Sequence, residues 1–291
     1  MKADDPAFAD VGRLLAASAM LRLEASGGRA ARPLARLARA TPAARVAGSR
    51  GDGDATAHAL SRALRTTAAG RLGAGERDLV ERVEARRRRL AAEHGDTAAV
   101  FTEEPGATGV RWEHVARPGP LADKCGTISI PPRWGVLLVR LVRELRPRVC
   151  VELGTGFGLS AAFTAAALEL NGEGELVTLE GAEEWAQVAR AGAEELGLGR
   201  LAIRVGPLSE TLPAALGELG PVDFAFVDAE HTKESTLRYF DQLRANVSEG
   251  AVLLFDDIDF DREMWEAWEE IRAHPRVRAW VALGRLGLVR T

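Results

Sequence analysis

The stretch VCVELGTGFGLS occupies residues 149–160 and decides the fold. An apolar strand pattern runs into three glycines at alternate positions, and a helical pattern follows as far as Leu168. Glycine lets a ligand approach the backbone closely, and the first turn of a helix presents N–H groups that have no partner within the helix. The stretch therefore predicts a strand, a ligand-binding turn and a helix.

Strands and helices alternate on both sides of this turn. The hydrophobic pattern predicts strands over 148–153, 175–180, 201–205, 222–228 and 251–256, and helices over 136–145, 183–196 and 233–246. Alternation of this kind is typical of a parallel sheet that is covered by helices on both faces. Two last strands, 277–282 and 286–290, are joined by Gly284-Arg285 as a hairpin. We expect an α/β fold: a doubly wound, mostly parallel seven-stranded sheet with a C-terminal antiparallel hairpin.

An alanine-rich helical segment precedes this sheet. Residues 1–118 are expected to form the helical segment, with helices near 54–64 and 76–94, and residues 119–291 the ligand-binding domain. Two roles for the segment stay open, a cap over a substrate pocket and a contact in a homodimer.

Composition excludes several classes of function. The chain has 291 residues, is 46% hydrophobic and 27% charged, and contains no apolar run near the ~20 residues of a membrane span. Its acidic start lacks the apolar core of a secretory signal, so we expect a cytoplasmic protein that does not bind membranes. Two cysteines, Cys125 and Cys150, are too few for a zinc site. The arginine run 86–89 follows glutamates on one predicted helix, which indicates an ion-paired face rather than a nucleic-acid site.

A second acid lies where a nucleoside ribose would need it. Glu180 ends the strand 175–180, 26 residues after Gly154. A carboxylate at the tip of this strand can accept hydrogen bonds from both ribose hydroxyls, although a solvated strand end is the simpler alternative. The dinucleotide fingerprint needs a glycine where this chain has Leu159, which argues against a nicotinamide cofactor.

With these motifs the sequence resembles class I S-adenosylmethionine-dependent methyltransferases, and among them the catechol-type and macrolide-sugar O-methyltransferases. The resemblance covers residues 127–291. It implies that S-adenosylmethionine is bound by the glycine loop, by Glu180 and by the stretch 126–131 laid over it. The implied cofactor-binding residues are Glu152, Gly154, Gly156, Gly158, Ser160, Glu180, Thr127 and Ser129. Pro207 stands where the group often has an acidic residue, so the adenine contact is unassigned.

Three aspartates follow two strands that we expect to be neighbours. Asp228 ends one strand, and Asp256 and Asp257 end the next, so their carboxylates are expected ~5 Å apart at one edge of the sheet. Crowded carboxylates repel one another unless a cation neutralises them, and an all-oxygen set suits Mg²⁺. The resemblance also implies metal ligands at these aspartates. The simpler alternative is that Asp228 lines the cofactor pocket, that the other two cap a loop, and that His231 is merely a partner for one of them.

The resulting hypothesis is the O-methylation of a small-molecule hydroxyl. His231, three residues after Asp228, stands where the macrolide-sugar enzymes have a histidine base and the catechol-type enzymes a lysine. We expect His231 and Asp228 to be catalytic, with possible assistance from Mg²⁺ bound by Asp228, Asp256 and Asp257. The alternatives are an N- or C-methyltransferase without a metal, a nicotinamide-dependent oxidoreductase, and a non-catalytic protein that binds S-adenosylmethionine.

Overall fold

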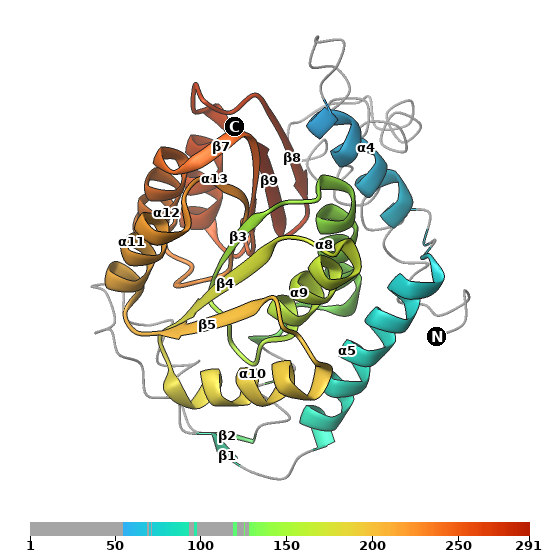
Figure 1. The fold of residues 1–291 in the computed structure, drawn as a ribbon. Coiled ribbons are helices and arrows are strands. Elements are labelled where there is room, and N and C mark those ends of the chain that lie inside the picture. The colour runs from blue at the N-terminus through green and yellow to red at the C-terminus, as the bar shows by residue number, and fades with distance from the viewer. Residues whose placement is uncertain are drawn as a thin grey trace, which may run out of the picture.

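The computed structural model describes residues 55–68, 70, 72–92, 96–97, 119–120, 125 and 128–291 (Figure 1). A seven-stranded sheet has the order β5-β4-β3-β6-β7-β9-β8. Its strands are β3 (Val149–Leu153), β4 (Glu175–Glu180), β5 (Leu201–Val205), β6 (Val222–Val227), β7 (Val247–Phe255), β8 (Ala279–Leu283) and β9 (Leu286–Arg290). The first five strands in this order are parallel, while β9 pairs antiparallel with β7 and β8. The predicted fold class is confirmed for these residues.

Helices cover both faces of the sheet. One face carries α8 (Pro132–Leu145), α9 (Leu159–Asn171) and α10 (Glu183–Leu196); the other carries α11 (Leu208–Leu219), α12 (Lys233–Ala245) and α13 (Arg262–Ala273). Alternate residues of each strand serve the two faces. In β6, for example, Phe224 and Phe226 pack under α8 and α9, whereas Ala225 and Val227 pack under α11 and α12.

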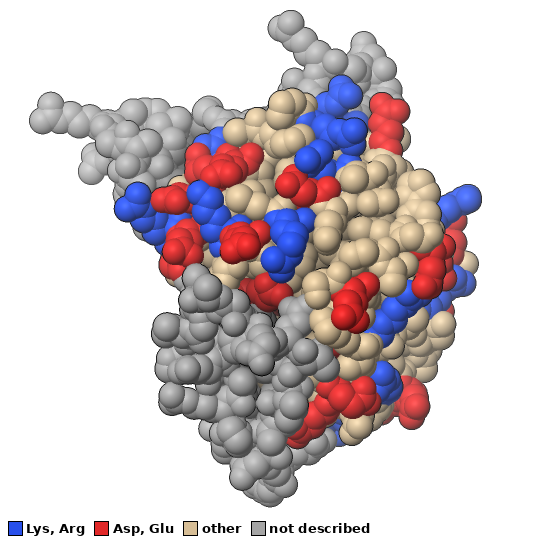
Figure 2. All heavy atoms as spheres, turned by 90° about the vertical axis from the view of Figure 1, so that its left-hand side faces the viewer, with Lys and Arg blue, Asp and Glu red and all other residues tan. Residues whose placement is uncertain are grey.

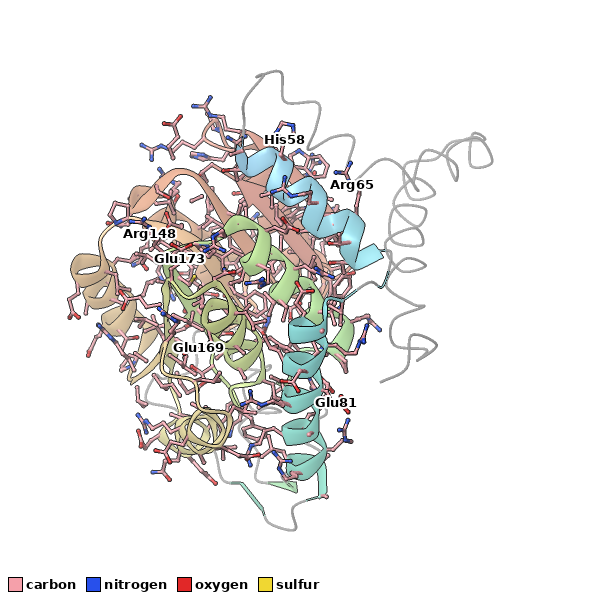
Figure 3. All side chains as sticks on the ribbon, turned by 45° about the vertical axis from the view of Figure 1, so that its right-hand side comes forward. His58, Arg65, Glu81, Arg148, Glu169 and Glu173 are labelled. Atoms are coloured by element: carbon pink, nitrogen blue, oxygen red, sulfur yellow. The ribbon has the colours of Figure 1, made fainter. Side chains whose placement is uncertain are left out.

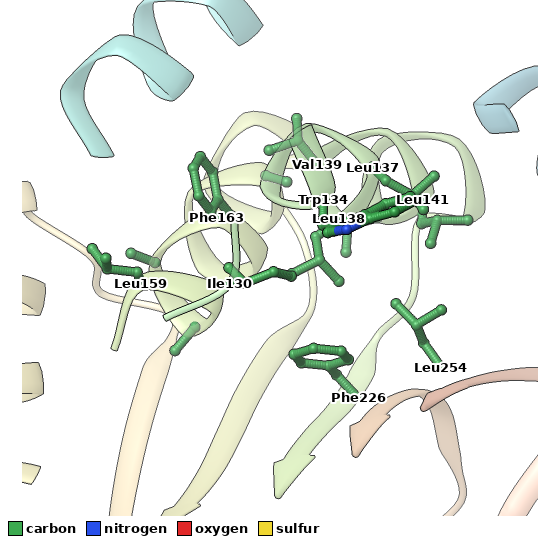
Figure 4. Close-up of a cluster of buried hydrophobic side chains, with 14 of the residues drawn as sticks. Ile130, Trp134, Leu137, Leu138, Val139, Leu141, Leu159, Phe163, Phe226 and Leu254 are labelled. Carbon is green, nitrogen blue, oxygen red and sulfur yellow. The ribbon is translucent and has the colours of Figure 1, made fainter. Parts of the chain in front are cut away.

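The core between α8 and the sheet is closely packed. Trp134 and Leu138 of α8 lie above Phe226 and Leu254 (Figure 4), and each of the four is at most 2% exposed. Gly135 allows α9 to cross closely, because a Cβ atom there would lie 2.2 Å from the ring of Phe163. This packing fixes α8 and the segment before it over the β3–α9 turn.

Two helices of the expected N-terminal segment pack on the same face. They are α4 (Ala55–Ala68), against α8, and α5 (Ala74–Ala92), against α9. Leu60, Leu79 and Leu90 belong to the same buried cluster as α8 and α9, and burial of one leucine contributes about 1.5–3 kcal/mol. On the outer side of these helices, His58, Arg65 and Glu81 are exposed (Figure 3). Strand β1 (Asp96–Thr97) pairs antiparallel with β2 (Gly119–Pro120). Apart from β1 and residues 70, 72 and 73, the remaining part of residues 1–118 lies outside the described residues, and the division at 118/119 stays a prediction.

The arginine run near the end of α5 forms ion pairs, as predicted. Arg87 pairs with Glu84 of its own helix at 3.0 Å, and Arg86 and Arg89 pair with Glu195 of α10. On the face shown in Figure 2, positive and negative side chains are also interleaved. None of the described helices is long and apolar enough to cross a membrane.

One helix was not predicted. Helix α11 (Leu208–Leu219) follows Gly206-Pro207, contains Pro213 and Gly217 and ends at Gly220, and these residues are typical of a loop. It forms because Leu208, Leu212 and Leu216 recur every four residues and bury themselves against the sheet. Burial of that stripe outweighs the hydrogen bond that Pro213 cannot donate.

Candidate functional site

The glycine loop between β3 and α9 lies against the tips of the neighbouring strands. Gly154, Gly156 and Gly158 all have positive φ values, of 89°, 54° and 79°. A Cβ atom on Gly154 would lie 2.0 Å from the backbone oxygen of Asp228, and one on Gly158 2.8 Å from Cβ of Ala189. Only glycine fits these two positions, so the sequence pattern has a steric reason.

Gly156 is different, because the described residues leave space around it. Among them, a Cβ atom there would meet nothing nearer than the side chain of Ile128, at 3.6 Å. Ile128 belongs to the stretch 126–131 that the sequence predicted to lie over the loop. Arg87 of α5 donates to the backbone oxygen of Ile130 at 2.6 Å and so connects α5 to this stretch. Ser129 lies 3.9 Å from the sulfur of Cys125, and Thr127 falls outside the described residues.

Glu180 contacts the same loop from the end of β4. Its carboxylate accepts hydrogen bonds from the backbone N–H of Gly156 at 2.7 Å and of Ala182 at 2.9 Å. The residue is 4% exposed, and burial raises its pKa to about 7 in spite of these hydrogen bonds. The predicted ribose acceptor is therefore held at the loop.

Glu152 lies beneath the loop and is 1% exposed. Thr178 donates to its Oε2 atom at 2.6 Å, while Oε1 is buried and makes no hydrogen bond of ordinary geometry with the described residues, although the Ser160 hydroxyl lies near enough to the carboxylate to lower its pKa. Burial raises the pKa of Glu152 to about 8. Ser160, at the start of α9, is also buried. An orphaned buried acceptor beside a glycine cradle fits a ligand that carries an ammonium group and a carboxylate, such as the methionine part of S-adenosylmethionine.

The aspartates and His231 converge at the carboxyl ends of β6 and β7. Nε2 of His231 lies 3.0 Å from Oδ1 of Asp228 and 3.6 Å from Oδ2 of Asp257. Burial lowers the pKa of His231, but the hydrogen bond and charge of Asp228 outweigh this and raise it above its ordinary value. The predicted catalytic pair is therefore in hydrogen-bond contact.

The loops that follow β6 and β7 contain strained backbone. Glu230, His231 and Asp257 have φ values of 55°, 49° and 52°, in the left-handed region that residues with a Cβ rarely adopt. Such conformations persist where the surrounding structure holds them, and they cluster at functional sites. Phe260, in the loop after β7, is 56% exposed and stacks on the ring of His231, with the centroids 6.2 Å apart.

Sequence reasoning did not assign a role to Arg285. From the β8–β9 turn its guanidinium binds both oxygens of Asp256, Nε to Oδ1 at 2.5 Å and Nη2 to Oδ2 at 2.8 Å. Nη2 also lies 3.0 Å from Oδ1 of Asp257. The strand register contains the signal that would have found it: Phe255 pairs with Gly287, which brings the turn level with the two aspartates.

The predicted Mg²⁺ ligands do not fit a divalent cation in this arrangement. Both oxygens of Asp256 are used by Arg285, and Oδ1 accepts a further bond from the backbone N–H of Asp257 at 2.7 Å. Among the described residues, no group of three or more histidines, cysteines, aspartates and glutamates is arranged to hold a metal. The acidic residues converge as expected, but Arg285 occupies the carboxylates of Asp256 and Asp257.

Comparisons with known proteins agree with the glycine loop and the sheet. Residues 151–258 match the family described as a methyltransferase domain. Over 133 residues the chain is 32% identical to a catechol O-methyltransferase of Niastella koreensis. This alignment covers 45% of the chain and 58% of that relative, so the chain spans less than two thirds of the relative's length.

Two solved structures are similar to part of this chain. The cofactor-bound structure of Rv0187 from MTB is 25% identical, with a TM-score of 0.50, and covers 56% of this chain and 81% of that one. An O-methyltransferase from Bacillus cereus in complex with SAH is 27% identical, with a TM-score of 0.48, and covers 56% of this chain and 83% of that one.

Proposed function

Since residues 151–258 lie in a class I S-adenosylmethionine-dependent methyltransferase domain, we propose that this protein methylates a hydroxyl group of a small molecule. One observation carries the proposal: the pair His231–Asp228 directly adjoins the glycine loop. The backbone of Asp228 is so close to Gly154 that no Cβ fits between them, and its carboxylate lies 3.0 Å from His231. A methyl donor bound in the loop would thus lie next to the proposed base at the end of β6.

The loop residues would hold the donor. Glu180 would accept hydrogen bonds from the ribose, and Gly154, Gly156, Gly158 and Ser160 would surround the methionine part. Glu152 would support the loop and offer its unpartnered Oε1 to the ammonium group. Ser129 and Thr127 belong to the stretch proposed to cover it. When bound, S-adenosylmethionine supplies a methyl group on a good leaving group, so the protein mainly has to align and deprotonate the acceptor.

His231 would remove the proton of the acceptor hydroxyl. The carboxylate of Asp228 lies 3.0 Å from Nε2 of His231, and we assign the proton of this hydrogen bond to Nε2, so that Nδ1 would take the proton of the acceptor. Asp228 fixes the ring and stabilises the imidazolium that forms. The exposed ring of Phe260 beside His231 offers an apolar contact for the acceptor.

Magnesium assistance, the finer part of the sequence hypothesis, is not part of this proposal. Two of the three carboxylates that would bind the ion, those of Asp256 and Asp257, are engaged by Arg285, and that of Asp228 lies 3.0 Å from His231. We do propose a role for α5 as part of a cap, because Arg87 joins it to the stretch over Gly156.

Methyl transfer tests the proposal. The protein would be incubated with S-adenosylmethionine carrying a labelled methyl group and with separate pools of phenols, sugar-bearing compounds and amines. We expect the label on an oxygen atom, as located by mass spectrometry and NMR. Label found on nitrogen or carbon alone would contradict the O-methyltransferase proposal.

A further inference from the structure

We propose that the guanidinium of Arg285 takes the place of a divalent cation at the sheet edge. It would hold Asp256 and Asp257 in position permanently, so that methyl transfer proceeds without a metal. This inference concerns the same site as the proposed function and rests on it for the statement about turnover. The statement about cation binding stands by itself, because it follows from the carboxylates alone.

The contacts of Arg285 leave little room for a metal. Oδ1 of Asp256 accepts from Nε of Arg285 and from the backbone N–H of Asp257, and Oδ2 accepts from Nη2. Asp256 is buried, and its side chain is 0% exposed. A cation that bound Asp256 would have to displace a two-pronged, charge-assisted interaction, which is the strong form of such contacts.

Asp257 is held from two sides. Arg285 lies 3.0 Å from Oδ1, and His231 lies 3.6 Å from Oδ2. Without Arg285, the carboxylates of Asp256 and Asp257 would therefore repel each other. Asp257, which flanks His231, would also be held less firmly. Arg285 is thus a positioning residue, because it acts on the proposed base through Asp257.

The fold itself fixes the position of this arginine. The backbone oxygen of Arg285 accepts a hydrogen bond from the N–H of Ile258 at 2.9 Å, one residue beyond Asp257. Gly284, with a φ value of 72°, permits the tight β8–β9 turn. Because the β8–β9 turn is hydrogen-bonded to the segment after β7, the sheet itself positions the guanidinium of Arg285, and no ion from solution is needed.

A guanidinium keeps its positive charge over the whole physiological range of pH. Burial lowers the pKa of Arg285, but the charges of Asp256 and Asp257 outweigh this and raise it further. Arg285 therefore supplies one permanent positive charge to Asp256 and Asp257. Unlike a metal ion, however, Arg285 has no open coordination position to bind and acidify a hydroxyl, so deprotonation is left to His231.

Binding of Mn²⁺, followed by electron paramagnetic resonance, tests the inference on the full chain. We expect the wild-type protein to leave the signal of free Mn²⁺ unchanged. Arg285→Gln and Arg285→Ala should bind one Mn²⁺ and so lower the signal of free Mn²⁺, at concentrations at least about tenfold below those at which the wild type still shows no binding, because one positive charge is removed from beside two carboxylates. Adding Asp256→Asn to either variant should abolish this binding. Arg285→Lys restores the charge and should return the protein to the wild-type result.

Arg262→Ala is the matched control, because Arg262 forms a surface pair with Glu266 and is 90% exposed. It should change nothing. Titration with S-adenosylhomocysteine identifies the variants that are folded. It also separates this test from the proposed function, because a wild-type protein that does not bind S-adenosylhomocysteine would refute the proposed function but not the inference about cation binding. Turnover of the wild type should be unaffected by EDTA.

Two results would overturn the inference. The first is tight Mn²⁺ binding by the wild type that Asp256→Asn removes. The second is a folded Arg285→Gln variant that binds no more Mn²⁺ than the wild type. If no Arg285 variant folds, the comparison of wild type and Asp256→Asn decides.

Discussion

Replacing Gly154 by alanine would test how closely the glycine loop packs against the tip of β6. The new Cβ atom would lie 2.0 Å from the backbone oxygen of Asp228 and 2.9 Å from its carbonyl carbon. Backbone atoms cannot rotate away as a side chain can, so the loop or the strand tip has to move. We therefore expect loss of stability together with weaker binding of S-adenosylhomocysteine.

The magnitude has two parts. A φ value of 89° at a residue with a Cβ costs about 1–2 kcal/mol, and overpacking at a rigid contact adds about 1–3 kcal/mol. The free energy of unfolding should thus fall by about 2–5 kcal/mol. Gly172 separates the two parts, since its φ value is 74° and a Cβ there would meet nothing within 4 Å. Gly172→Ala should cost only the first part, about 1–2 kcal/mol.

Urea denaturation followed by circular dichroism measures both variants. Gly156→Ala completes the set, because its Cβ would meet no atom nearer than 3.6 Å. It should lose about as much stability as Gly172→Ala but, unlike it, weaken S-adenosylhomocysteine binding, since Gly156 is in the loop. Equal stability of the Gly154→Ala and Gly172→Ala variants would refute the packing argument.

Three further predictions follow from the site and from α5. His231→Gln should lower kcat by about 10²–10⁴-fold, as loss of a general base does, with little change in the Kd of S-adenosylhomocysteine; unchanged turnover would contradict the base assignment. Burial raises the pKa of Glu152 from 4.5 to about 8, so the ionised side chain is less favourable in the folded state than in the unfolded state. The protein therefore loses stability as the pH rises from 4.5 to about 8. Glu152→Gln should therefore gain up to about 3–5 kcal/mol relative to wild type between pH 5 and pH 9 in urea denaturation, and a difference independent of pH would disprove the shift. Arg140→Ala removes the 2.8 Å partner of the buried Glu76 and should cost about 3 kcal/mol, against less than about 1 kcal/mol for Arg62→Ala at an exposed pair; equal losses would contradict the buried pair.

Much of the sheet could be predicted from the sequence, because its strands are short apolar runs between clear helical patterns. The expected bounds of β4, α10 and β5 agree with the structure. Helix α11 was missed because its prolines obscure the four-residue spacing of its leucines. The class I methyltransferase domain itself was recognised from the glycine loop and Glu180, and the family match confirms it.

The electrostatics of the site could not be predicted in the same way. The convergence of Asp228 and Asp257 on His231 follows from neighbouring strands, and was expected. The pairing of Arg285 with Asp256 and Asp257 was not expected, because Arg285 is 29 residues from Asp256 and meets it only through the register of β9 on β7. The left-handed backbone at His231 likewise has no signature in composition.

The central claim is that the loop and Glu180 bind S-adenosylmethionine. Calorimetric titration with S-adenosylhomocysteine tests it most directly, with NAD as the comparison ligand and with Glu180→Gln as the matched variant. The account predicts that the wild type binds S-adenosylhomocysteine at one site with micromolar affinity and does not bind NAD. The Glu180→Gln variant should bind S-adenosylhomocysteine at least about tenfold more weakly, because the ribose hydroxyls lose their charged acceptor. Absence of S-adenosylhomocysteine binding, or preferential binding of NAD, would contradict it.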